Sequence, residues 1–143
     1  MFDSAKRVIS GTFGYLWLNG EIVAEVTGFS AKYSYNKTTI GMSGQFVNDQ
    51  KIMSADGTGS VTLHKVNSRF LTDEAIEMLN GKDCRATIVS ALKDPDAYGF
   101  ERVAVYNVSF DDLTLADWRH GEVGSITRPF TFTRHELLDA ISA

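Results

Sequence analysis

The three histidines are the first residues to consider, because an imidazole can bind a metal ion or carry a proton near neutral pH. His64, His120 and His135 are scattered along the 143 residues of the chain. No two of them have the spacing that places a pair of ligands on one face of a strand or helix. We therefore interpret them as polar residues at the surface or at strand edges, and the sequence predicts no metal site.

Two acidic segments have residue types that occur in hydrolases. Asp111 and Asp112 are adjacent carboxylates, but neighbours at the end of a strand point to opposite faces, so a turn explains this pair better. The segment Asp56-Gly57-Thr58-Gly59 differs in order from an aspartic-protease loop, and turn chemistry explains it too. No nucleophile is accompanied by a base and an orienting group, so the sequence predicts no enzyme.

Glycine and cysteine give no cofactor site either. Gly11 and Gly14 are spaced glycines that do not precede a helix, which argues against a phosphate-binding loop. Cys84 is the only cysteine, and this excludes both an intramolecular disulfide and a thiolate zinc site. We interpret Cys84 as a half-buried thiol in a strand, and we expect no cofactor.

Length and charge indicate one soluble domain, residues 1–143. The formal net charge is −4, and no block of lysine or arginine is present. Tight binding to a phosphate backbone needs clustered cations, so any DNA nearby should pass without binding tightly. The segment Met1–Arg7 lacks the apolar stretch of a secretory signal, and no later segment has the length to cross a bilayer. We expect a protein made in a cytoplasm, without a membrane anchor.

Alternation of apolar and polar residues with a period of two dominates the chain and predicts mostly β-strands. The pair Asn19-Gly20 favours a tight hairpin turn, after which a long strand should run from Glu21 through Tyr35. The predicted strands are residues 12–19, the long strand after the turn, 59–66, 85–92, 101–110, roughly 113–118, and 125–134.

Two helices are predicted. In the first, Asn67 or Ser68 can cap the start, Gly81 ends the helix, and a single apolar stripe consists of Leu71, Ala75, Met78 and Leu79. Residues 135–143 form a carboxy-terminal extension, which can fold as a short amphipathic helix through Leu137, Leu138 and Ile141.

Residues 36–58 interrupt the strand pattern for longer than an ordinary connection in a compact domain. The segment contains apolar residues that require burial, which disfavours disorder. We therefore predict a protruding arm. The fold class is mainly β: a single-domain β-barrel or sandwich with one flanking α-helix and a long protruding inter-strand loop.

The aromatic residues leave one alternative function open. Most of them are expected in the core, and a minority could anchor an interface with another protein. Alternatively, Trp17, Tyr33 and Trp118 could line the apolar pocket of a monomeric ligand-binding β-barrel.

An ordered set of short motifs extends from about Val8 to Thr133. Its members are Ile9-Ser10-Gly11, Gly14, Leu16, Leu18-Asn19-Gly20-Glu21, Asn36-Lys37, Gly57-Thr58-Gly59, Lys65-Val66, Ser68, Phe70, Glu101-Arg102-Val103, Tyr106, Val108, Phe110 and Pro129-Phe130-Thr131-Phe132. In order and spacing this set resembles the tail-tube protein family of contractile phage tails, defective prophages and phage-tail-like bacteriocins.

The resemblance implies a structural subunit that polymerises as stacked hexameric rings into the inner tube of a contractile tail. The implied partners are further copies of the chain, the sheath protein, the baseplate initiator, the tail terminator, and tape-measure protein or DNA passing through the lumen. The implied location is a virion or phage-tail-like particle assembled in the cytoplasm of the host bacterium. Such tubes would use the amino-terminal arm (residues 1–11), the arm at 36–58 and the extension at 135–143 for subunit contacts. The candidate interface residues are Lys37, Ile40, Met42, Phe46, Val47, Ile52, Met53, Leu137 and Leu138.

Overall fold

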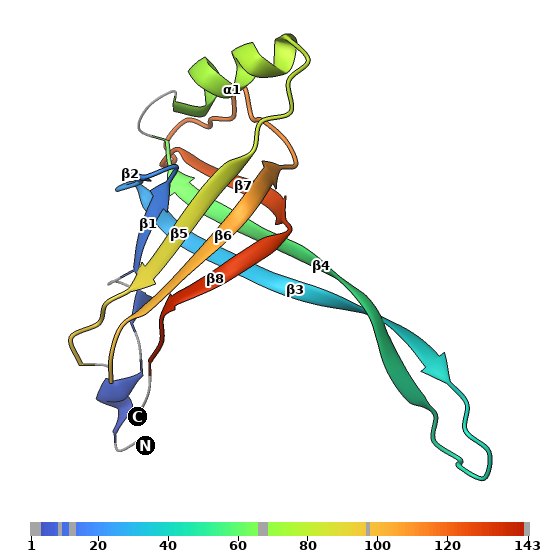
Figure 1. Cartoon of the computed structure of the whole chain (residues 1–143). Coiled ribbons are helices and arrows are strands. Elements are labelled where there is room, and N and C mark those ends of the chain that lie inside the picture. The colour runs from blue at the N-terminus through green and yellow to red at the C-terminus, as the bar shows by residue number, and fades with distance from the viewer. Residues whose placement is uncertain (1–3, 9, 12–13, 66–68, 97, 142–143) are drawn as a thin grey trace.

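The computed structural model describes residues 4–8, 10–11, 14–65, 69–96 and 98–141 (Figure 1). These residues are mainly β, as predicted, with one α-helix of three turns. After a short 3-10 helix at Ala5–Arg7, the elements are β1 (Gly14–Leu18), β2 (Glu21–Ile22), β3 (Val26–Ile40), β4 (Asp49–His64), α1 (Arg69–Leu79), β5 (Ala86–Leu92), β6 (Glu101–Phe110), β7 (Ser125–Phe132) and β8 (Arg134–Asp139).

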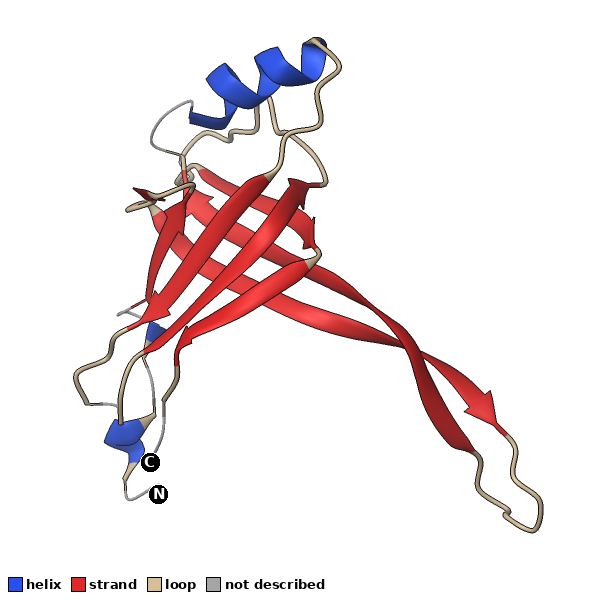
Figure 2. Cartoon of the chain, in the orientation of Figure 1, coloured by secondary structure: helices blue, strands red, loops and turns tan. Residues whose placement is uncertain are grey.

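The strands form two layers whose pairs are all antiparallel (Figure 2). One layer contains β1, β5, β6 and β8, and the other contains β7, β4 and β3. The path of hydrogen-bonded neighbours runs β2-β1-β5-β6-β7-β4-β3, with β8 added on β6. Among the described residues β2 and β3 end this path without pairing with each other, so the barrel is open on one side.

The core lies between the two layers. Its best-buried side chains are Leu16, Val23, Val61, Ile88, Val105, Val108, Phe130 and Phe132. Phe130 is the centre of an aromatic group, because Phe29 stacks on it at 5.9 Å and Phe110 meets it edge-on at 6.0 Å. The alternation predicted for residues 125–134 is confirmed, since Phe130 and Phe132 both point into this core.

β6 changes partner at Asn107. Before this residue β6 pairs with β8, and after it Ser109 and Phe110 pair with β7. Asn107 has a left-handed backbone (φ +59°), and its side-chain amide donates a hydrogen bond of 3.1 Å to the Thr133 hydroxyl. Thr133 lies between β7 and β8. The hydrogen bond therefore ties β6, at the residue where it changes partner, to the junction of β7 and β8.

A test of this corner compares Asn107→Gly with Asn107→Val. Valine should lower the free energy of unfolding by about 1–3 kcal/mol, because a β-branched residue is strained at positive φ. Glycine should cost less than about 1 kcal/mol, because it loses one exposed hydrogen bond but relaxes the backbone. Urea unfolding followed by tryptophan fluorescence measures both. Equal losses for the two variants would show that the backbone conformation at Asn107 is not what matters.

The first hairpin follows the prediction at its turn and departs from it afterwards. Asn19 and Gly20 have φ of +51° and +87°, as a type I′ turn requires. The single long strand predicted from Glu21 is wrong, because the chain leaves the sheet after Ile22 and re-enters it at Val26. The break allows Val23 to turn into the core, where it is 2% exposed.

α1 ends as predicted at Gly81, which has φ of +75°. The Gly81 N–H donates to the Met78 carbonyl and the Lys82 N–H to the Glu77 carbonyl, the paired bonds of a Schellman motif. The predicted caps, Asn67 and Ser68, lie outside the described residues. The predicted apolar stripe is only partly buried: Ala75 is half-buried, whereas Met78 and Leu79 are exposed. The interpretation of Cys84 is half right, since the thiol is half-buried but precedes β5.

Three further element predictions are wrong. Residues 135–139 belong to β8 instead of a helix, because pairing with the edge of β6 outweighs their helical apolar pattern. The strand predicted at residues 113–118 is an irregular connection between β6 and β7. The strand predicted at 59–66 begins ten residues earlier, at Asp49, and ends at His64.

Candidate assembly interface

Of the arm predicted at residues 36–58, residues 36–56 protrude from the body, as a β-hairpin instead of a loop, whereas Gly57 and Thr58 pair with β7 in the body (Figure 2). β3 continues to Ile40, and β4 starts at Asp49, its partner across the hairpin. Every residue from Asn36 to Asp56 is exposed. The arm therefore satisfies its own backbone hydrogen bonds while its side chains face solvent.

A bulge separates the arm from the body of the sheet. Asn36 pairs with Ser54 and Lys37 pairs with Ile52, so Met53 is an extra residue on β4. Such a bulge increases the local twist of a strand pair. The Asn36 amide donates to the Ser54 hydroxyl at 3.0 Å and to the Asp56 carboxylate at 3.1 Å, which holds the two strands together beside the bulge.

The tip of the arm is a defined turn. The Gln45 N–H donates to the Met42 carbonyl at 3.2 Å, and Gly44 has φ of +78°, as the third residue of a type II turn requires. The two residues that follow are apolar and point into solvent: Phe46 is 102% exposed and Val47 is 70% exposed. The turn thus presents two apolar side chains at the far end of the hairpin.

Apolar residues occupy both faces of the arm. Ile40 is paired with Asp49, so these two side chains point to the same face. Ile52 follows Asp49 by three residues on β4 and therefore points to the opposite face. All seven predicted arm residues are exposed: Lys37, Ile40, Met42, Phe46, Val47, Ile52 and Met53. Tyr35, which the prediction did not include, is exposed beside them on β3. A two-stranded hairpin with no layer against it is marginally stable in water, and exposed apolar residues grouped in this way are typical of interaction sites.

Leu137 and Leu138, the other two predicted residues, lie on β8 in the body of the protein and not on the arm (Figure 1). Both are exposed. The Tyr106 hydroxyl donates to Glu136 at 2.8 Å and Arg102 pairs with Asp139 at 3.1 Å, which fixes the register of β8 on β6. The predicted residues therefore form two separate surfaces.

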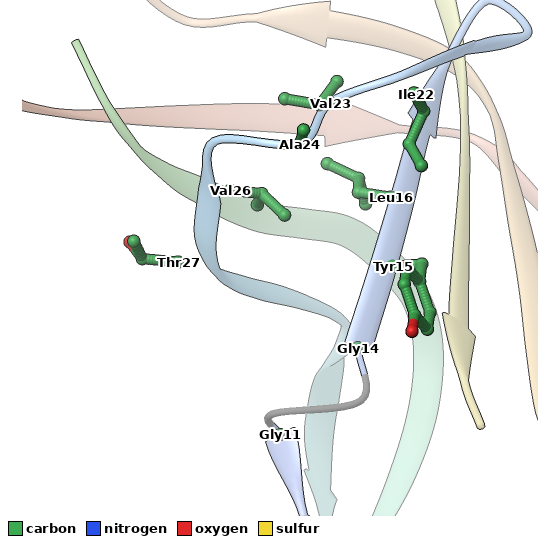
Figure 3. A pocket seen from close by; sticks show the side chains of 9 residues that line it. All are labelled: Gly11, Gly14, Tyr15, Leu16, Ile22, Val23, Ala24, Val26 and Thr27. Atoms are coloured by element: carbon green, nitrogen blue, oxygen red, sulfur yellow. The ribbon is translucent and has the colours of Figure 1, made fainter. Parts of the chain in front are cut away.

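A groove lies at the open side of the barrel, between β1 and the start of β3 (Figure 3). Its volume is about 550 Å³. We call it the seam groove; it is lined by Gly11, Gly14, Tyr15, Leu16, Ile22, Val23, Ala24, Val26 and Thr27. Leu16, Val23 and Val26 gather at its floor. Sequence reasoning missed the groove, because it depends on the lack of hydrogen-bond pairing between β1 and β3 in the described sheet, which no local sequence pattern shows.

The end of the barrel under α1 has a second exposed apolar surface. The connection between β6 and β7 runs beneath α1 (Figure 1). Exposed apolar side chains there are Ile76, Met78 and Leu79 from α1 and Leu115, Trp118 and Val123 from the connection. We call these six residues the helix-end surface.

The outer face of β3, β4 and β7 is polar and small. Across the three strands, Lys32 lies beside Thr58 and Thr58 beside Thr131. Thr62 and Thr127 are neighbours with their hydroxyls 3.2 Å apart. This hydroxyl-rich face also contains Thr127 and Thr131 of β7.

The amino-terminal segment is fixed to the connection between β5 and β6. The Ser10 N–H donates to the Asp94 carboxylate at 2.9 Å. The Arg7 guanidinium donates to the Asp96 carbonyl at 3.1 Å and lies 4.9 Å from the centre of the Tyr98 ring. The described part of residues 1–11 thus lies against the body at the end of the barrel opposite α1 (Figure 1).

The titratable residues form no catalytic arrangement in the described part of the chain. No group of three or more His, Cys, Asp or Glu side chains there could hold a metal ion. A hydrogen bond to Glu77, followed by burial, raises the pKa of Cys84, which opposes formation of a reactive thiolate. A hydrogen bond to Glu136 raises the pKa of Tyr106 in the same way.

The aromatic pocket of the alternative function is absent from the described residues, because its three members lie in different surroundings. Trp17 is beside Tyr15, Tyr33 packs on Phe132, and Trp118 is 73% exposed. In the same part of the chain, no helix has the length and apolar character needed to cross a membrane.

Comparison with known proteins gives a family match and a fold match. The family model described as "Phage tail tube protein" matches residues 2–139. The chain is 32% identical over 140 residues to the phage-like element PBSX protein XkdM of Bacillus subtilis, covering 96% of this chain and 95% of XkdM.

Two chains from an extracellular contractile injection system, PVC, are similar in fold. One belongs to the sheath–tube complex in the extended state, with a TM-score of 0.68, 10% identity and 95% of each chain covered. The other belongs to the sheath/tube terminator structure, with a TM-score of 0.70, 10% identity, and coverage of 95% of this chain and 100% of that one.

Proposed function

The chain belongs to the phage tail tube protein family, and we propose that it polymerises as stacked hexameric rings that form the inner tube of a contractile tail or phage-tail-like particle. A tail tube subunit is a structural protein and not an enzyme. Its place is in a virion or phage-tail-like particle. We further infer that assembly takes place in the cytoplasm of the host bacterium.

The single observation that supports polymerisation best is the arm. It projects exposed apolar residues on both faces and at its tip, including Ile40, Ile52 and Phe46. Burial of such residues contributes about 25 cal/mol per Å² of apolar surface, so a neighbour that encloses the arm gains substantially. We infer that the arm makes contacts between subunits and between rings, and that Leu137 and Leu138 contribute a second contact on the body.

Ring closure requires free strand edges, and the fold has them at both ends of its sheet path. β2 is one end of the path and β3 is the other. Unpaired edges promote association of sheets, and a closed ring of subunits would cover them. We infer that neighbouring subunits pair at these edges, and the sixfold count comes from the family resemblance.

We assign the hydroxyl-rich face of β3, β4 and β7 to the lumen. Its side chains are mostly short and polar, as in the pairs Ser30 with Ser60 and Thr58 with Thr131. A face without clustered cations lets tape-measure protein or DNA pass without tight binding. The overall charge of −4 has the sign that weakens contact with nucleic acid.

We propose that the sheath protein, the baseplate initiator and the tail terminator are the other partners. The PVC structures with similar chains are described as a sheath–tube complex and as a sheath/tube terminator. The helix-end surface is our candidate for sheath contact, because Ile76, Leu79 and Trp118 are apolar and exposed on one end of the barrel.

The test of this function removes the arm and images the product. Residues 37–53 are replaced by a short turn that joins Asn36 to Ser54, which are already paired across the hairpin. The body should stay folded, because every well-buried core residue lies outside the deleted segment. We expect wild-type protein to form rings or tubes in negative-stain electron microscopy of concentrated samples, or after co-expression with a baseplate initiator, and the variant to remain a soluble monomer.

The matched control keeps the arm and changes only polar positions, as in Thr39→Ala with Gln50→Ala. This control should form tubes like those of the wild type. Tubes of normal length built from the armless variant would refute the assembly role of the arm. A wild-type protein that never forms rings or tubes under either condition would refute the tube function itself.

A further inference from the structure

We propose that the tip of the arm, Phe46 and Val47, inserts into the seam groove of a second copy of this chain. The proposal rests on the proposed tube function and deepens it, because it names the surface that receives the arm. It joins two apolar features: the exposed pair of side chains at the tip, and a groove of about 550 Å³ whose lining includes the exposed Tyr15 and Ile22. The contact is heterologous, with a different surface contributed by each copy.

A subunit cannot fill its own groove. β3 begins in the seam groove at Val26 and ends beside the tip at Ile40. A strand of 15 residues spans about 50 Å, so the groove and the tip lie at opposite ends of one long strand. Figure 1 shows the same separation, with β1 at one side of the barrel and the end of the hairpin far beyond the other. The occupant must therefore come from another molecule.

The two surfaces match in polarity. Leu16, Val23 and Val26 form an apolar floor, and Tyr15 and Ile22 lie along β1 at its side (Figure 3). Aromatic and branched aliphatic side chains fill such a groove without leaving a polar group unsatisfied. The turn from Met42 to Gln45 orders the chain directly before the tip, which lowers the entropy lost on insertion.

Charge on the two surfaces is complementary. Residues 14–27 around the groove include Glu21 and Glu25 and no lysine or arginine. The arm from residue 37 to 53 has two lysines, Lys37 and Lys51, and one acidic residue, Asp49. No charged residue lines the groove itself, but Glu21 and Glu25 flank its lining residues and attract a net positive arm, which disfavours groove-to-groove and arm-to-arm contacts.

A heterologous contact of this kind repeats from copy to copy. A subunit whose tip is inserted still offers its own groove, and the subunit that receives it still presents its own tip, so the contact propagates into a closed ring or an open stack. The seam groove also lies beside the two ends of the sheet path, β2 and β3, where an inserted segment would cover exposed strand edges.

The test uses two complementary variants, each lacking half of the contact. The tip variant contains Phe46→Ser and Val47→Ser, and the groove variant contains Tyr15→Lys and Ile22→Lys, two positions that are exposed in the single chain. Neither variant alone should assemble. When mixed, the intact tip of the groove variant can enter the intact groove of the tip variant, and growth then stops at a heterodimer, which light scattering after size exclusion would detect.

A crosslink makes the same contact visible if it is weak. In a Cys84→Ser background, Val47→Cys is added to the groove variant and Thr27→Cys to the tip variant, and a short bis-maleimide is applied. We expect a crosslinked heterodimer in the mixture that neither variant gives alone. Circular dichroism confirms that both variants are folded. Controls of matched chemistry are Ser43→Ala with Gln45→Ala in the turn before the tip, and Phe100→Lys at an exposed aromatic position outside the groove lining; both should assemble normally.

The outcomes separate this contact from the tube function. If wild-type tubes form but the mixture gives neither heterodimer nor crosslink, the tip does not bind the groove, and the tube function stands. If the heterodimer forms but wild-type protein never makes tubes, the contact stands and the tube function fails. Normal assembly by either the tip variant or the groove variant alone would also overturn the proposed contact.

Discussion

Replacement of Gly59 by alanine is expected to lower the free energy of unfolding by about 3 kcal/mol, the upper part of the range for overpacked cores. Gly59 lies on β4 between Ala31 of β3 and Phe130 of β7. A Cβ atom at this position would lie 2.6 Å from the Phe130 ring and would overlap the Ser30 carbonyl oxygen. Phe130 is 1% exposed at the centre of the core, so neither the ring nor the strand can move without loss of packing.

Gly28→Ala is the matched control for Gly59→Ala. Gly28 also lies in the β3–β4 pair, but a Cβ there would only touch Thr62 at 3.9 Å, an ordinary contact. Its cost should stay within about 0.5 kcal/mol, as for substitutions away from special features. Urea unfolding of both variants measures the difference. If Gly59→Ala were as mild as Gly28→Ala, the close approach of Phe130 to β4 would not be present in solution.

A second measurement separates ring from backbone. Phe130→Leu shortens the side chain that the new methyl group meets, so Gly59→Ala should cost less in that background. Part of the cost should remain, because the Ser30 carbonyl is still in the way. Full additivity of the two substitutions would mean that the ring and the methyl group do not compete for the same space.

The elements that depend on local chemistry were predictable from the sequence. The Asn19-Gly20 turn and the helix end at Gly81 both need a left-handed backbone, and residue type alone indicates this. β8 was not predictable, because Leu137, Leu138 and Ile141 together have the spacing of an apolar helix face. The strand forms only through its pairing with β6. The irregular connection over residues 113–118 likewise depends on how α1 covers the end of the barrel.

The candidate interface was predictable in outline but not in form. The apolar content of residues 36–58 indicated a protruding arm, yet its glycines and polar run concealed two regular strands, because β3 and β4 stabilise each other through a register that no local pattern shows. Individual residues such as Phe46 could be chosen because apolar side chains on a protrusion stay exposed. The seam groove could not be predicted, since Leu16 of β1 and Val26 of β3 come together only in the folded sheet.

α1 is fastened to the barrel by a buried ion pair, and its energetics give the second large effect. Arg128 on β7 is 1% exposed and donates two hydrogen bonds to Glu74 of α1, at 2.7 and 3.0 Å. It also donates to the Asp112 carbonyl, and its guanidinium lies 4.1 Å from the centre of the Phe110 ring. The side chain thus joins α1, the connection after β6 and the core. Glu74 is less buried, with a side chain 22% exposed.

This difference in burial predicts that removal of Glu74 lowers the free energy of unfolding more than replacement of Arg128 does. Glu74→Ala should lower the free energy of unfolding by about 3–5 kcal/mol, because it leaves a buried guanidinium without its carboxylate. Arg128→Met should cost about 1–2 kcal/mol, since methionine fills the space and the partly exposed Glu74 can be hydrated by water. In the Arg128→Met background, Glu74→Ala should then cost far less than in the wild type. Urea unfolding of the four proteins in this cycle gives the coupling energy, and amide exchange over residues 69–79 reports whether α1 detaches first.

The Arg85–Asp83 pair is the control, because its side chains are 45% and 66% exposed. Arg85→Ala should change the free energy of unfolding by about 0.5 kcal/mol or less, as is usual for a solvated ion pair. If Glu74→Ala were equally mild, water would have to reach the guanidinium of Arg128. The helix would then be held mainly by its buried apolar surface, to which the half-buried Ala75 contributes and the exposed Met78 and Leu79 do not.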